Sequence, residues 1–130
     1  MGRLCVVFFV ILTSCRGDDD ACIDVDLTCQ PLYDPVFDEV FTRTLLPKCG
    51  VPGSACHGDS GRQNGLGFVT ADEAYDLLLA SRVVPGDPGC SLIVRRIESS
   101  DSSFVMPPGA PIAAAERCAI IQWIADGAQR

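Results

Sequence analysis

Two short motifs of this chain carry residue types that commonly bind metal centres in proteins. Cys56 and His57 are adjacent, and Met106 follows fifty residues later in front of two prolines. A thiol beside an imidazole ends the haem-attachment motif C-x-x-C-H, in which two thiols bind the haem vinyl groups and the histidine binds iron. Gly53 stands where this motif has its first cysteine. The pattern therefore predicts a single thioether from Cys56, with His57 and Met106 as the two axial iron ligands.

This pair of ligands favours one kind of chemistry. Imidazole and thioether together stabilise ferrous iron and raise its reduction potential. When both axial positions are filled, no coordination position is left for a substrate, so the pattern predicts electron transfer and no enzyme activity. A hydrolytic enzyme is not indicated, because the chain has one histidine and neither a G-x-S-x-G nor an H-E-x-x-H motif.

Residues 1–14 have the features of an export signal. Arg3 precedes a continuous apolar run of nine residues that ends at Leu12. A span across the bilayer needs roughly 20 apolar residues, whereas a signal peptide needs fewer. The run Leu12-Thr13-Ser14-Cys15 resembles the lipobox of bacterial lipoproteins, in which the cysteine becomes the first mature residue and carries lipid. An ordinary cleaved secretory signal is the alternative. Arg16 after Cys15 implies the outer membrane in a host with two membranes.

The mature chain is long enough for one domain and is acidic. Without Arg3 it has nine Lys/Arg against 17 Asp/Glu, a balance that opposes binding to nucleic acid or to an anionic lipid surface. We expect residues 15–33 to form a tether with a small Cys22/Cys29 loop, and residues 34–130 to form the domain. The expected partners are a redox protein, not identified by the sequence, and a membrane bound through the lipid anchor.

Eight cysteines set a second constraint, and six remain once Cys5 in the signal and the lipidated Cys15 are removed. Thiols of exported proteins tend to form disulfides, and six cysteines allow 15 connectivities. Proximity favours Cys22–Cys29, and the helix layout favours Cys90–Cys118. Cys49 and Cys56 would then remain. If they pair, Cys56 cannot hold haem; if Cys56 holds haem, Cys49 is either an odd thiol or a second attachment point at unusual spacing.

Periodicity predicts short helices joined by Gly/Pro-rich loops. Asp34 and Pro35 suit the start of a first helix, which Pro47 should end. Thr70 and Glu73 form a capping-box pattern at the start of a second helix. A short third helix starts after Asp87 or Ser91, and the last covers residues 113–126 before Gly127. Because no stretch alternates with period two for long, we expect an all-α fold with little or no sheet.

These features together resemble the bacterial cytochrome c-like domains of exported proteins. The resemblance covers about residues 37–128. It rests on the order and spacing of a first helix, Cys56-His57-Gly58, Val84-Pro85-Gly86-Asp87-Pro88, Met106-Pro107-Pro108-Gly109 and a last helix with Trp123. It implies an all-α domain whose first and last helices pack together with haem in a crevice, His57 and Met106 as axial ligands, and Cys56 as a thioether. Gly53 departs from the family pattern at the second thioether.

Some of these residues also fit another interpretation. Arg95 and Arg96 are candidates to bind haem propionates, although a solvated helix face explains at least one of the pair. Trp123 is better explained as a core residue than as an electron relay. The alternative for the whole protein is a haem-free cytochrome-like fold, stapled by a Cys49–Cys56 disulfide and acting as a membrane-anchored structural or interaction module.

Overall fold

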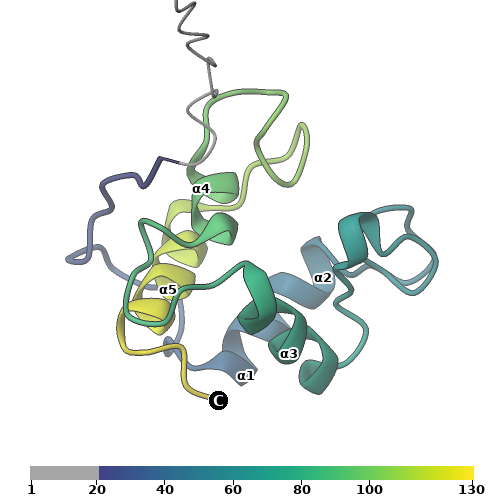
Figure 1. Ribbon diagram of the computed structural model, residues 1–130, viewed down its shortest axis with the longest axis horizontal. Coiled ribbons are helices and arrows are strands. Elements are labelled where there is room, and N and C mark those ends of the chain that lie inside the picture. The colour runs from purple at the N-terminus through teal and green to yellow at the C-terminus, as the bar shows by residue number, and fades with distance from the viewer. Residues whose placement is uncertain (1–20) are drawn as a thin grey trace, which may run out of the picture.

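The computed structural model describes residues 21–130, and the regular structure within this range is entirely helical (Figure 1). This agrees with the all-α class predicted from the sequence. The predicted export signal and Cys15 lie outside the described residues. Within residues 21–130, no helix combines the length and the apolar composition needed to cross a membrane.

The first helical region is continuous but changes its winding. It consists of α1 (Phe37–Val40), the π-helical η2 (Phe41–Leu45) and α2 (Leu46–Lys48). The expected start at Pro35 is wrong, because Val36 is extended, with φ −113° and ψ 151°. The helix ends at Lys48, one residue after the expected end at Pro47. Proline has no N–H to donate within a helix, and a wider π-type turn lies just before it.

Three further helices lie close to their predicted positions: α3 (Ala71–Ser81), α4 (Leu92–Glu98) and α5 (Ala114–Ala125). The short 3₁₀ turn η3 (Gln63–Gly65) was not predicted and lies within the expected loop before α3. The Thr70 side chain accepts a hydrogen bond of 3.3 Å from the Glu73 N–H, as a helix cap does. Ser91 is the N-cap residue of α4, but its hydroxyl binds the Asp87 carbonyl of the preceding turn instead of capping the helix.

The first and last helices pack together through aromatic rings, as the resemblance implied. Phe37 of α1 lies 5.2 Å from Trp123 of α5 and 5.0 Å from Tyr75 of α3, measured between ring centroids. Phe37 and Trp123 are almost fully buried, so Trp123 is a core residue. Its indole N–H donates to the Gln129 carbonyl, and the Tyr75 hydroxyl of α3 donates to the Ala128 carbonyl, so the end of the chain (marked C in Figure 1) is held against α5 and α3.

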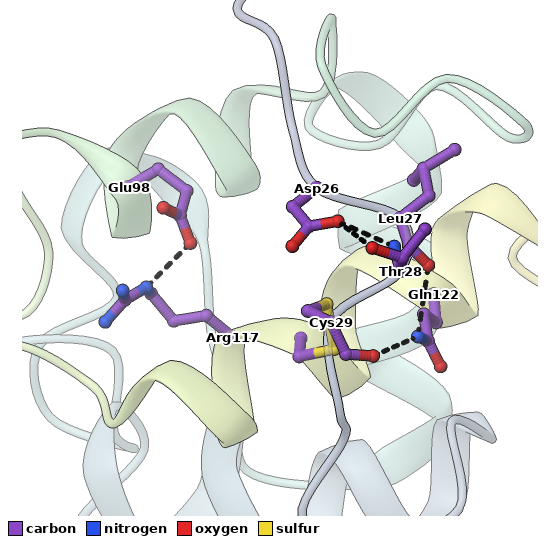
Figure 2. The surroundings of a disulfide bond; sticks show 8 residues. Asp26, Leu27, Thr28, Cys29, Glu98, Arg117 and Gln122 are labelled. Carbon is purple, nitrogen blue, oxygen red and sulfur yellow. Dashed lines mark hydrogen bonds and ion pairs between the residues drawn. A yellow bond between two sulfur atoms is a disulfide. The ribbon is translucent and has the colours of Figure 1, made fainter.

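The segment before α1 runs along α4 and α5 and does not form a local loop. The Ile23 N–H donates to the Gly89 carbonyl, and the Leu32 N–H donates to the Ala115 carbonyl. The Gln122 side-chain amide of α5 donates to the carbonyls of Leu27 and Cys29, at 3.3 and 2.8 Å (Figure 2). This segment therefore belongs to the packed body of the domain.

The disulfides join this segment to the two helices. Cys22 is bonded to Cys90 and Cys29 to Cys118, with Cα–Cα distances of 4.3 and 5.9 Å. The predicted Cys22–Cys29 and Cys90–Cys118 pairs are therefore wrong, although the four cysteines themselves are disulfide-bonded. The reason is that the extended segment carries Cys22 to the turn before α4 and Cys29 to α5, so each finds a partner far away in sequence.

A polar cluster is buried where α5 meets η2 and α2. Glu116 is 5% exposed and accepts hydrogen bonds from Thr44 and Lys48. Thr44 is fully buried and also hydrogen-bonds to the Tyr33 hydroxyl. Since each buried oxygen has a partner, the cluster ties α5 to the end of the first helical region, one residue before Cys49.

Candidate functional site

An open cavity of about 320 Å³ lies among the end of the first helical region, the loop before α3, the end of α3, α4 and the loop before α5. This volume is typical of the smaller ligand-binding pockets. Its wall is mostly apolar, with a few polar side chains. The lining residues are Leu45, Cys49, His57, Gln63, Asn64, Leu66, Phe68, Ser81, Arg82, Leu92, Ile93, Arg96, Ile97, Met106 and Ile112.

His57 is fixed in the wall by three contacts with residues 66–68. Its Nδ1 lies 3.0 Å from the Leu66 carbonyl oxygen. Its carbonyl accepts a bond of 2.8 Å from the Phe68 N–H, and its ring packs edge-on against the Phe68 ring. A carbonyl only accepts, so Nδ1 carries the proton and Nε2 of the neutral ring keeps its lone pair. This is how proteins orient a histidine that binds metal through Nε2.

Met106 reaches the same cavity from the loop between α4 and α5. Its N–H donates to the Arg96 carbonyl, at 3.0 Å. The Arg96 guanidinium in turn donates to the Phe104 carbonyl and lies 3.9 Å from the centroid of the Phe104 ring. These contacts hold the loop against the end of α4. The fold thus brings together two side chains, His57 and Met106, that lie 49 positions apart in the sequence.

Cys49 and Cys56 are the unpaired cysteines among the described residues. Cys49 lines the cavity, whereas Cys56 is exposed and does not belong to the lining. The His57 N–H donates to the Cys49 carbonyl at 3.3 Å, which places Cys49 beside the residue that follows Cys56. Burial, followed by the nearby Cys56, raises the pKa of Cys49 from its ordinary value of 9.0 to about 12.

The two arginines singled out from the sequence separate in the structure. Arg96 lines the cavity, whereas Arg95 lies at a different surface hollow, where it donates to the Ala21 carbonyl. Arg82, at the end of α3, lines the cavity as well and donates to the Asn64 carbonyl at 2.6 Å. No motif around Arg82 pointed to this position, because it depends on how α3 packs against the loop.

Close backbone contacts shape the loop that carries the site. A Cβ at Gly58 would lie 2.4 Å from the Val51 carbonyl oxygen, and a Cβ at Gly50 would lie 2.4 Å from the Phe68 carbonyl oxygen. Both positions therefore need glycine. Gly53 differs: it is exposed, has φ +74°, and a Cβ there would contact nothing within 4 Å. The position of the missing motif cysteine lies on the outside of the loop.

The donor set of the cavity fits haem better than a bare metal ion. In residues 21–130 no group of three or more His, Cys, Asp or Glu side chains is placed to hold a metal ion. The cavity instead offers one imidazole and one thioether in an apolar wall. Two such ligands suit the axial positions of an iron whose other ligands come from a porphyrin.

Comparison with known proteins agrees with this donor set. Residues 54–109 match the model of a family described as Planctomycete cytochrome C. This match supports a cytochrome c-like domain. It includes Cys56, His57 and Met106 and begins five residues after Cys49. No curated protein and no solved structure matches the chain significantly.

Sequence reasoning about the cytochrome c-like domain left the place of Cys49 open. Two features could have pointed to Cys49 as a residue of the site. It directly follows the first helical region, and it precedes Cys56 by seven positions. The structure adds that the Cys49 side chain is part of the cavity wall.

Proposed function

We propose that the cytochrome c-like domain binds one haem in the cavity and transfers electrons, with His57 and Met106 as axial ligands and Cys56 bound to a vinyl group. The observation that carries the proposal is that both side chains line one apolar cavity while Nδ1 of His57 is bonded to the Leu66 carbonyl. The bound haem would supply the redox chemistry.

The residues of the chain would bind, orient and shield this group. The Leu66 carbonyl sets the tautomer and the orientation of His57, and Phe68 packs against its ring. The apolar wall excludes water and so disfavours the extra positive charge of the oxidised centre, which adds to the effect of Met106 on the potential. Arg82 and Arg96 lie in the wall, where a guanidinium suits a propionate carboxylate.

The visible spectrum of the exported protein, matured with a working haem-attachment system, tests this function. We expect a low-spin spectrum and a positive pyridine haemochrome assay. His57→Ala should abolish the low-spin haem, and Met106→Ala should lower the potential and admit small ligands. Ser102→Ala, at an exposed position outside the cavity wall, is the control and should keep the spectrum. A protein without a Soret band would overturn the proposal and leave the haem-free interaction module.

We also propose that the domain is held at a membrane as a lipoprotein, on the periplasmic or outer face, and that a redox protein is its partner. The support is the sequence that ends at Cys15 and the acidic charge of the chain. Changing Cys15→Ala should release the protein from the membrane fraction or leave its precursor uncut. Unchanged processing and fractionation would contradict the lipid anchor.

A further inference from the structure

Two unpaired thiols flank His57 in different ways, and only one of them lines the cavity. Cys49 is the C-cap residue of α2, half-buried, in the cavity wall with His57 and Met106. Cys56 is joined to His57 by the peptide bond. The bond from the His57 N–H to the Cys49 carbonyl places the two segments side by side. His57 therefore has one cysteine next to it in the sequence and a second brought beside it by the fold, although six residues separate the two cysteines.

We infer that Cys49 and Cys56 bind the two vinyl groups of the same haem, so that the attachment motif of this chain is C-x6-C-H. This inference rests on the proposed haem binding and replaces the single thioether expected from the sequence. The missing thiol of C-x-x-C-H is then not lost from the site, because Cys49 supplies it from the end of α2.

The loop between the two thiols is folded outward. The Ser54 N–H donates to the Val51 carbonyl in a turn, and the Gly53 N–H donates to the Asp59 carboxylate. Gly53 at the tip is exposed, and a Cβ there would contact nothing. A cysteine at position 53 would not reach the wall that Cys49 already lines. The four extra residues relative to C-x-x-C-H are taken up by this turn.

Cys49 and Cys56 are both free thiols, as attachment to two vinyl groups requires, since a disulfide between them would consume both. The four cysteines on the other side of the domain are paired, whereas Cys49 and Cys56 are not.

The proposed reaction needs no oxidant or reductant. Each thiol adds across one vinyl double bond: sulfur bonds to the vinyl carbon next to the ring, and the thiol proton ends on the terminal carbon. Two such additions consume both vinyl groups and both thiols, and the mass of the product equals chain plus haem with no hydrogen lost.

The test counts attachments in the full-length protein matured with a haem-attachment system. The purified protein is denatured without reductant, alkylated with iodoacetamide and digested with trypsin. Cleavage after Lys48 and Arg62 gives one peptide, residues 49–62, that contains both thiols and His57. We expect this peptide to carry one haem and no alkyl group. Cys49→Ser and Cys56→Ser should each keep haem through one bond, with a red-shifted reduced α band, and the double variant should lose haem to acidified organic solvent.

The outcomes separate the inference from the proposed function. Ser102→Ala changes an exposed residue outside the cavity wall and should keep both attachments. A haem peptide with an alkylated Cys49, and a wild-type α band equal to that of Cys49→Ser, would overturn the second thioether and leave the proposed function standing. A peptide without haem, whether bridged between Cys49 and Cys56 or alkylated at both, would overturn both.

Discussion

The two sides of the domain treat their cysteines differently. Where residues 21–33 cross α4 and α5, four cysteines form two disulfides, of which Figure 2 shows the one at Cys29. In the cavity loop, residues 49–66, two cysteines stay unpaired. They do so even though the hydrogen bond from the His57 N–H to the Cys49 carbonyl brings their backbone segments together. The first side is held by covalent cross-links between distant segments, whereas the second relies on main-chain hydrogen bonds and close glycine contacts. The difference separates thiols that stabilise the fold from thiols that are available to a ligand.

The largest effect should follow removal of a cross-link. The Cys29–Cys118 bond joins residues 89 positions apart. Replacing both by serine should lower the free energy of unfolding by about 4–5 kcal/mol in the chain-entropy model, since the bond restricts a long loop of the unfolded chain. Urea denaturation of the haem-free protein measures this. Cys49→Ser is the matched control, and an equal loss in that variant would remove the distinction between the two sides.

The reactivity of Cys49 tests the other side. In a haem-free Cys56→Ala variant, burial still raises the pKa of Cys49 above its ordinary value, so less of it is thiolate and its alkylation at pH 8 should be much slower than in denaturant. The folded state also keeps this proton at higher pH, so stability should fall as pH rises from about 9 towards 12. Cys49→Ser should lack this fall. Fast alkylation in the native state would show that the thiol is accessible.

Glu116 connects the two sides, because it belongs to α5 and binds Lys48, which precedes Cys49. Glu116→Ala should reduce stability by about 1–3 kcal/mol, because Thr44 and Lys48 lose a buried acceptor. Glu116→Gln keeps an acceptor and should lose less. Thermal unfolding compares the two variants, and equal losses would mean that packing alone explains the effect.

The smallest effect concerns the cap of α3, beyond the cavity loop. Thr70→Ala removes the bond to the Glu73 N–H and should cost about 1 kcal/mol. Thr70→Ser keeps the acceptor and is the control. Hydrogen exchange of the first turn of α3 should rise in the alanine variant only, and a similar rise in both would assign the effect to the lost methyl group.

Sequence reasoning reached those parts of the fold that depend on local signals. Thr70 with Glu73, and Gly127 after the last helix, marked helix ends that the structure has within one residue. It failed where distant segments decide. Cys22 and Cys29 are close in sequence but lie against different partners, because the extended segment follows α4 and α5. Cys49 and Arg82 line the cavity through packing that no short pattern encodes.

The hydrogen bond between the His57 N–H and the Cys49 carbonyl has a consequence for how such a site evolves. It brings both ends of the intervening turn together, so insertions or deletions at the exposed Gly53 tip would leave the imidazole and the Cys49 side chain where they are. The number of residues between the two thiols can then change during evolution while the distance between them in space stays the same. Relatives of this domain would share a three-dimensional arrangement of thiol, thiol and imidazole instead of a fixed string of letters.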